Sequence, residues 1–497
     1  MAPPPSVAYA TLSAPLPSNP YILSITPSPT TPHLILRHPS AELTIADNQT
    51  LQPVDRLRDG HKGLISSVAA DAEGGALWSA GKDANIVRWD ERSRRAASVI
   101  KAFVRKPLPV TALAVSSRDH LVIGGTELVS SEAHILFWDD RNPSQPAYSH
   151  TSTHSDDITH LSILPTTSTF LRSSGLSSSS SSGAPPLPDK LLLSSSTDGL
   201  VALSNMKETD EDEAVLAAEN WGQSIADARA YLHKGKMRVW ARSDMDAVAI
   251  WEAGKGPEDE LELQNLVEYP TESFKFKDFK PPQQGAHTVQ TATEEREAKH
   301  KLKSDYLIDV CPSLGISKYG VPITAVGTND GDIVLQHQHQ GPSSSSTSST
   351  YVPSAYLLTG PTKTRGHKDV IRALYHDLSN EAIYTGSEDG VLSGWSLASL
   401  PERLVVGDPE IDDEDADRGD DEDMEDEDEE SEIETETEEE SDKSDEDDFD
   451  MEKDEKERGP RYGPIIGAGA DASGSGKGGR GVEGRKEKRR EKRFDPY

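Results

Sequence analysis

The chain has 497 residues and a formal net charge of −35, with 86 Asp and Glu residues against 51 Lys and Arg residues. Residues 408–457 hold 33 acidic and four basic residues, a net charge of −29, which leaves −6 for the rest of the chain. The single cysteine, Cys311, excludes an intramolecular disulfide framework, and no apolar run approaches the ~18 residues that a membrane-spanning helix needs. The N-terminal residues lack the basic and apolar regions of a secretory signal, so we expect an intracellular protein without a membrane-embedded part.

Residues 7–58 predict one small antiparallel unit. Three runs of strand-forming residues, at 21–25, 33–37 and 42–46, are separated by turns that contain Pro or Asn. We interpret this segment as the first of several repeated units, although it lacks the sequence marks that the later units carry.

Residues 60–90 carry such marks, and residues 366–396 repeat them. A Gly-His pair opens each stretch, an Asp lies in a turn, and a Trp closes it; 27 residues separate the Gly-His pair from the Trp in both copies. Between the marks, short apolar runs with a period of two predict antiparallel strands. The pattern is the signature of a WD40 unit, one blade of a β-propeller, and the identical spacing of two distant copies strengthens it.

We predict a structural role for the polar marks of these units. In the WD40 pattern they form a buried hydrogen-bond chain that joins a Trp indole, a hydroxyl, an imidazole and a turn carboxylate. The predicted members are His61, Ser79, Asp83 and Trp89 in the first copy, and His367, Thr385, Asp389 and Trp395 in the second. A His-Ser-Asp set could also belong to a hydrolase, but a catalytic triad need not occur twice. We therefore expect no catalytic residue, no cofactor and no metal site.

Two further blades follow the first marked unit. Residues 110–139 predict the third blade. The fourth opens near residue 153 and resumes at residue 191 after a Ser-rich stretch, residues 166–188, which predicts a flexible surface loop. In the fourth blade the network positions are taken by His154, Ser194 and Asp198, and Ser204 replaces the Trp.

The blade count follows from the length of the repeats. Polar segments at 254–300 and 338–352 predict two more flexible inserts. Without the three inserts, the first 400 residues leave 315, or 45 per blade for seven blades, which matches the expected ~40–45. We therefore predict an all-β, seven-bladed WD40 propeller over residues 7–404. The last blade needs an outer strand; residues 6–12 and residues 403–406 are the two candidate sources, and the sequence does not decide between them.

Blades two to seven resemble the WD repeat-containing protein 89 family over about residues 60–400. The segments that carry the resemblance begin at Gly125, Phe137, Thr153 and Ser196 and end with the last Gly-His unit. The resemblance implies a non-enzymatic propeller scaffold and, through a plant relative, a connection to ribosome assembly. The basic cluster at 485–493 is similar to the short basic tail of that family, whereas the long acidic tract before it departs from the family pattern.

Two segments, Trp89-Asp-Glu-Arg92 and Trp138-Asp-Asp-Arg141, fit the motif W-D-x-R. The motif is associated with WD40 proteins that dock on the cullin-4 ubiquitin ligase adaptor as substrate receptors. Arg92 and Arg141 would then reach the rim of the propeller and pair with the acidic surface of the adaptor. The alternative is that each arginine pairs with a neighbouring loop carboxylate.

The end of the chain predicts disorder. Residues 405–457 form an acidic tract that has almost nothing apolar to bury, and residues 458–497 form a Gly-rich, basic tail. The tract fits basic partners such as ribosomal proteins or histones, and a solubilising role is the alternative. The basic cluster favours nuclear import, and direct nucleic-acid binding is not expected because aromatic residues for base stacking are absent there.

The sequence as a whole therefore predicts a non-enzymatic scaffold for protein–protein interactions. We expect it in the nucleus or nucleolus, with the cytoplasm as the alternative. Among cellular processes, ribosome biogenesis is the first hypothesis for its role. The competing hypothesis is that the protein is a substrate receptor of a cullin-4 type ubiquitin ligase.

Overall fold

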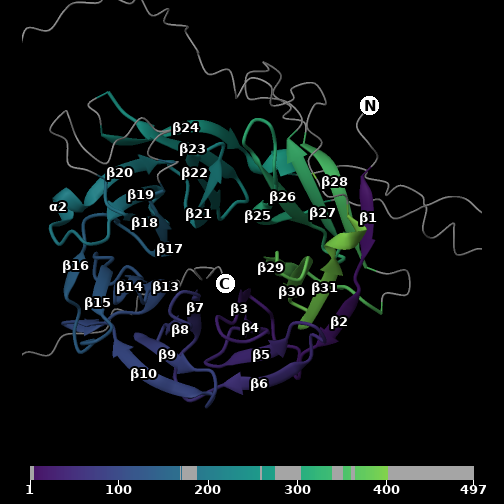
Figure 1. Cartoon of the computed structure of the whole chain (residues 1–497), viewed down its shortest axis with the longest axis horizontal. Helices are drawn as coiled ribbons and strands as arrows, with labels where there is room; N and C mark the ends of the chain where they lie inside the picture. Colours follow the sequence, from purple (N-terminus) through teal and green to yellow (C-terminus); the bar gives the residue numbers. More distant parts are fainter. Residues whose placement is uncertain are drawn as a thin grey trace, which may run out of the picture. The chain divides into compact units, whose positions relative to one another are not determined.

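The computed structural model describes residues 5–167, 170, 187–257, 260–274, 304–338, 351–359, 364–400 and 404. Seven antiparallel sheets stand around a common axis as the blades of a propeller (Figure 1). In each blade the first strand lies nearest the axis, and in the first five blades the fourth strand lies at the rim (Figure 1). The predicted seven-bladed β-propeller is thereby confirmed. No helix among the described residues has the length and apolar character needed to cross a membrane.

The first four blades follow one another along the chain. Blade one, interpreted from strand-like runs alone, consists of β3 (Ser24–Pro27), β4 (His33–Arg37), β5 (Leu43–Asp47) and β6 (Pro53–Leu57). Blade two consists of β7 (Ile65–Asp71), β8 (Ala76–Gly81), β9 (Asn85–Asp90) and β10 (Arg95–Lys101). Blade three consists of β13 (Val110–Ser116), β14 (Leu121–Thr126), β15 (Ile135–Asp139) and β16 (Tyr148–His150). Blade four consists of β17 (Ile158–Pro165), β18 (Lys190–Ser196), β19 (Leu200–Asn205) and β20 (Val215–Asn220).

The last three blades complete the ring. Blade five consists of β21 (Ile225–His233), β22 (Lys236–Ser243), β23 (Val248–Lys255) and β24 (Leu261–Tyr269). Blade six contains β25 (Tyr306–Ile316), β26 (Pro322–Gly327), β27 (Ile333–Gln338) and β28 (Tyr351–Leu358), and blade seven contains β29 (Ile371–Asp377), β30 (Ala382–Ser387) and β31 (Val391–Ser396). The remaining elements are β11 (Phe103–Val104), β12 (Lys106–Pro107), α2 (Glu211–Ala214), η1 (Thr271–Phe274) and η2 (Leu397–Ser399).

The N-terminal residues close the ring. Strand β2 (Leu12–Pro15) pairs antiparallel with β31 and is the outer strand of blade seven. Strand β1 (Ser6–Tyr9), which lies within the segment predicted to close blade seven, instead pairs parallel with β28 and adds a fifth strand to blade six. Of the two sources that the sequence leaves open, the structure uses the N-terminal one, but the closing strand shares only Leu12 with the segment considered. Of the alternative segment, only Leu404 is described, and it is buried against blades six and seven.

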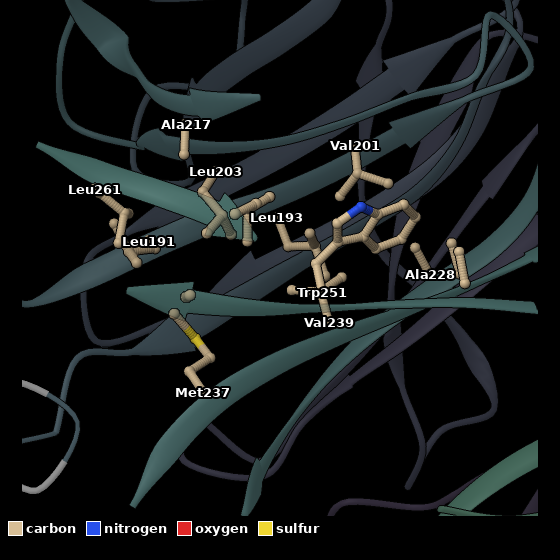
Figure 2. Packing of buried hydrophobic residues seen from close by; sticks show 14 of the residues in the cluster. Leu191, Leu193, Val201, Leu203, Ala217, Ala228, Met237, Val239, Trp251 and Leu261 are labelled. Carbon is tan, nitrogen blue, oxygen red and sulfur yellow. The ribbon is translucent and has the colours of Figure 1, made fainter. Parts of the chain in front are cut away.

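The core lies between neighbouring blades, and this explains why middle strands such as β8 are apolar runs. Strand β8 is buried at every position, because both faces of its sheet are covered by adjacent blades. Outer strand β10 is mostly exposed. Between blades four and five, side chains from both sheets interdigitate around Trp251 (Figure 2). The other labelled residues of this cluster are Leu191, Leu193, Val201, Leu203, Ala217, Ala228, Met237, Val239 and Leu261.

Two predicted inserts need correction. Strand β24 lies inside the insert predicted at 254–300, because its alternating apolar residues, among them Leu261 and Leu263, pack against blade four. In the insert predicted at 166–188, Phe170 is buried and Leu187 packs against the same core cluster. Phe170 and Leu187, two large apolar side chains of an otherwise polar stretch, therefore pack with the core, because their contact with it removes apolar surface from water.

Several other predictions lie outside the described residues. They are the greater part of the insert at 338–352, whose end positions belong to β27 and β28, and both parts of the C-terminal region, the acidic tract at 405–457 and the Gly-rich, basic tail at 458–497.

Candidate functional site

The predicted polar residues of blade two form a continuous buried chain. His61 precedes β7, Ser79 lies on β8, Asp83 lies in the turn after it, and Trp89 lies on β9. The Trp89 indole N–H donates to Ser79 Oγ at 2.8 Å, and Ser79 Oγ lies 2.7 Å from His61 Nε2. Because the Ser79 oxygen accepts from Trp89, its hydroxyl can donate to His61 Nε2, and His61 Nδ1–H can donate to Asp83 Oδ1 at 3.0 Å.

The turn carboxylate of this chain also holds the backbone. Asp83 accepts the N–H of Lys62 at 2.7 Å and the side-chain amide of Asn85 at 2.9 Å. Burial raises the pKa of Asp83, but the bonds from Lys62 and His61 outweigh it, so the pKa lies below its usual value. The carboxylate is therefore ionised at neutral pH, and it ties the loop before β7 to the turn after β8.

Blade seven has the same residues in a looser arrangement. His367 Nε2 lies 2.6 Å from Thr385 Oγ1, but His367 Nδ1 lies 3.6 Å from Asp389 Oδ1. Asp389 accepts the backbone N–H of Lys368 at 2.9 Å. The indole N–H of Trp395 is buried and has no hydrogen-bond partner among the described residues. The hydrogen-bond chain predicted for this blade therefore does not extend to its Trp.

Blade four keeps three of the four positions. His154 Nε2 lies 2.8 Å from Ser194 Oγ, and His154 Nδ1 lies 3.5 Å from Asp198 Oδ2. Asp198 also accepts the N–H of Ser155 at 2.7 Å. Ser204, at the position of the missing Trp, is buried.

Blade one contains a related pair that the sequence analysis missed. His38 Nε2 lies 2.9 Å from Thr44 Oγ1, and His38 Nδ1 lies 2.9 Å from the carbonyl oxygen of Tyr21. Burial lowers the pKa of His38. The signal was a His directly after a strand, but no turn Asp and no Trp accompanied it, so spacing alone could not find it.

A second missed feature joins the innermost strands of three blades. His160 on β17 lies 3.0 Å from Asp227 on β21, whose other oxygen lies 2.8 Å from Arg229. Arg229 also lies 3.6 Å from Asp309 on β25. Burial raises the pKa of Asp227, but the charges of Arg229 and His160 outweigh it and the pKa is lowered; at Asp309 burial prevails and the pKa is raised. These residues are far apart in the sequence and meet only because the first strands of blades four, five and six lie side by side in the ring, so no local pattern could reveal them.

The hydroxyl groups of the His-hydroxyl-Asp sets are buried and cannot reach a substrate. The Ser79, Ser194 and Thr385 side chains lie in residues that are 0% exposed. The Ser79 hydroxyl is already bonded to both His61 and Trp89. A nucleophile must reach its substrate, so these sets can rigidify turns but are not placed for acyl transfer. Among the described residues, no group of three or more side chains is arranged to hold a metal ion.

The two arginines of the W-D-x-R segments differ in their surroundings. Arg141 forms a two-pronged pair with Asp139 of its own segment, with Nε–H donating to Oδ1 at 2.8 Å and Nη2–H to Oδ2 at 2.5 Å. Arg92 is exposed; among the described residues it forms no short ion pair, but its charge interacts with that of Asp90 in the same segment. The structure thus places one of the two arginines against its own loop.

The network predicts different costs for two Trp replacements. We expect Trp89→Phe to lower the free energy of unfolding by about 1 kcal/mol more than Trp395→Phe, because only the Trp89 N–H loses a hydrogen bond. Urea denaturation of the full chain measures both. Equal losses would show that the Trp395 N–H is bonded after all.

The lowered carboxyl pKa values predict acid sensitivity. The pKa values of Asp83, Asp198 and Asp389 are lowered by their hydrogen bonds, against the effect of burial. Their ionised forms therefore stabilise the fold above the unfolded pKa of about 4, and this stabilisation is lost as the pH falls through the folded values. We expect the urea midpoint to fall between pH 5 and pH 3, and Asp83→Asn to show a smaller fall. A fall of the same size in Asp83→Asn would contradict a contribution of this carboxylate.

Comparison with known proteins agrees with the fold. No family model matches the chain. The chain is 22% identical over 370 residues to an uncharacterized WD repeat-containing protein of Schizosaccharomyces pombe; the match covers 73% of this chain and 92% of that protein. This similarity and the seven-bladed ring support a WD40 propeller protein, while membership of the WD repeat-containing protein 89 family stays a prediction.

Proposed function

We propose that the protein is a non-enzymatic interaction scaffold that binds basic proteins during nuclear or nucleolar assembly, with ribosome biogenesis as the leading process. The propeller fold and the WD repeat relative support an interaction scaffold in general. The observation that carries the choice of basic partners is the charge of the loops and turns of blades four to six on one face of the ring.

We call this surface the turn face. It is the end of the blades that carries the turns after their second strands, together with the loops that contain His61, His154 and His367. In blades four to six, the described loops and turns of this face contain no Lys or Arg, at residues 151–157, 197–199, 221–224, 244–247, 304–305 and 328–332. Exposed or half-buried carboxylates of these segments are Asp156, Asp157, Asp244, Asp246, Asp305 and Asp330.

This half of the turn face suits a basic partner. Carboxylates of one sign gathered on one surface raise the local concentration of positively charged ligands and speed their association. Met245, which is 73% exposed between Asp244 and Asp246, adds an apolar contact. In blade four, His154 and Asp198 hold the loop and the turn of this surface in shape. The acidic tract predicted at 405–457 would add attraction of the same sign.

Affinity purification tests the proposal. We expect the full chain to recover ribosomal proteins or their assembly factors at low salt, and less at high salt because exposed charges are screened. Asp244→Lys combined with Asp330→Lys should reduce this recovery. Glu73→Lys, which changes an exposed carboxylate on the opposite end of blade two, should not.

Removal of residues 405–497 separates the turn face from the acidic tract. If the double Lys variant retains full recovery and the truncated chain loses it, the tract alone attracts basic partners. Recovery of neither ribosomal proteins nor assembly factors by the parent chain would contradict the proposed process.

A substrate receptor of a cullin-4 type ubiquitin ligase is the second candidate. The exposure of Arg92, which forms no short ion pair among the described residues, favours it, whereas the bond between Arg141 and Asp139 competes with it. We expect a receptor to lose adaptor pull-down in the Arg92→Ala, Arg141→Ala double variant without losing stability. Unchanged pull-down would end this hypothesis.

A further inference from the structure

An arginine of blade one bridges two blades next to the axis of the ring. Arg37 is the last residue of β4, and its Nε–H donates to Ser24 Oγ at 3.1 Å. Its Nη1–H donates to the carbonyl oxygen of Ile65 at the longer distance of 3.5 Å. Ser24 and Ile65 are the first residues of β3 and β7, the innermost strands of blades one and two (Figure 1). The guanidinium therefore lies beside the axis, at the end of these strands that belongs to the turn face.

The charge of Arg37 has no counter-charge within the described part of the chain. Its two acceptors there are a hydroxyl and a carbonyl oxygen, not a carboxylate. Burial lowers the pKa of the guanidinium to about 10, and no described carboxylate raises it again. Glu42, in the turn after β4, is engaged by Arg56 and Arg58 at 3.3 and 3.7 Å. Because a charge that is removed from water without a partner costs free energy, Arg37 by itself destabilises the ring.

Blade five has an arginine at the same position, and there the charge is compensated. Arg242 on β22 lies opposite the first residue of the third strand, as Arg37 does on β4. Its Nη1–H donates at 2.8 Å to the carbonyl oxygen of Ile308 on the innermost strand of the next blade. The residue opposite Arg242 on the first strand is Asp227, whereas the residue opposite Arg37 is Ser24. Blade one therefore has a hydroxyl where blade five has a carboxylate.

Two donors at this position remain for a ligand. The Nη2 atom of Arg37 has no hydrogen-bond partner among the described residues. Ser24 Oγ accepts from Arg37, so the hydroxyl of Ser24 can still donate its own proton. Both residues are half-buried, so a small solute can reach them. Charge attraction is stronger at such a site than at a fully exposed one, because less water surrounds the charges.

We propose that Arg37 and Ser24 bind a small oxyanion, a phosphate or carboxylate group, which supplies the counter-charge that blade one lacks. The forked N–H donors of a guanidinium match the oxygen atoms of both groups, and charge-assisted pairs of this kind are stronger than neutral hydrogen bonds. The anion joins β3 to β7 through Arg37 and stabilises the junction of blades one and two. The site is separate from the acidic loops of blades four to six and does not depend on the proposed function.

The test is calorimetric titration of the full chain with inorganic phosphate and, separately, with acetate, at equal ionic strength. We expect Arg37→Met to weaken binding by at least about tenfold, because one lost charge-assisted pair corresponds to about that factor. Arg37→Lys should weaken it less, since the charge stays and only the forked geometry is lost. Ser24→Ala should also weaken it, because a donor is removed. Binding of phosphate alone assigns the site to phosphate groups, and binding of both anions extends it to carboxylates.

Arg242→Met is the matched control, because it removes the equivalent arginine beside Asp227. In chloride it should lower the melting temperature, whereas Arg37→Met should melt at or above the temperature of the parent, since it removes a buried charge without a partner. The proposal is overturned if the parent binds neither anion or if Arg37→Met binds them as tightly as the parent. It is also overturned if Arg37→Met loses as much melting temperature in chloride as Arg242→Met, because Arg37 would then have a structural role. None of these outcomes bears on the binding of basic partners.

Discussion

Ala14→Asp is expected to lower the free energy of unfolding by about 3–5 kcal/mol, the cost of an uncompensated buried charge. Ala14 lies on the closing strand β2 opposite Leu392 and is 0% exposed. It packs with Leu16, Ile22 and other residues at the junction of blades seven and one. A carboxylate at this position must either remain buried without a partner or detach β2 from β31, and both outcomes destabilise the ring.

Leu12→Asp is the control for this prediction. Leu12 belongs to the same strand but is 42% exposed, so a carboxylate there stays in water and should cost less than about 1 kcal/mol. Thermal melting and limited proteolysis of the full chain compare the two variants. If both melt together with the parent, β2 does not close the ring.

Asp83→Ala is expected to cost about 2–4 kcal/mol. The substitution removes the acceptor for His61, for the Lys62 N–H and for Asn85. His61 is buried, and a buried donor left unpaired costs about 1–3 kcal/mol, whereas the two more exposed donors can turn to water and add less. Asp389→Ala should cost less, about 1–3 kcal/mol, because His367 already lies 3.6 Å from the carboxylate. Urea denaturation followed by tryptophan fluorescence gives both values.

Asp330→Ala is the control for these two variants. Asp330 lies in the corresponding turn of blade six but is exposed, so its removal should change the free energy of unfolding by less than about 0.5 kcal/mol. A larger loss for Asp389→Ala than for Asp83→Ala would contradict the order of strengths that the distances imply. A melting midpoint of Asp389→Ala equal to that of the parent would show that the carboxylate of blade seven adds no stability.

The repeated spacing made the ring predictable. A blade cannot bury both sheet faces alone, so two copies of one unit imply further copies between them, and the residue count then gives seven. Blade one could be recognised without any motif, because its apolar runs at 33–37 and 42–46 are long enough to fill the space between two neighbours. Here local hydrophobic pattern and global fold agree.

The missed features depend on contacts between distant residues. Strand β24 was overlooked because polar residues such as Glu262 and Gln264 alternate with its buried leucines, so the average polarity of the segment concealed the period of two. The position of β2 depends on which N-terminal residues reach β31, and the sequence near residue 12 carries no mark of that register. That the N–H of Trp395 has no partner among the described residues depends on side-chain placement, which the repeated spacing does not specify.

The closing strand also sets a requirement on how the protein is made. Ser13 on β2 meets Ser393 on β31, a partner 380 residues further along the chain. At a translation rate of about 5–20 residues per second, the N-terminal strand leaves the ribosome about 20–80 s before that partner is synthesised. During this interval the growing polypeptide carries an unmatched strand edge, which is prone to aggregation. Cells that make this protein should therefore need a chaperone to shield its first residues until synthesis of the last blade is complete.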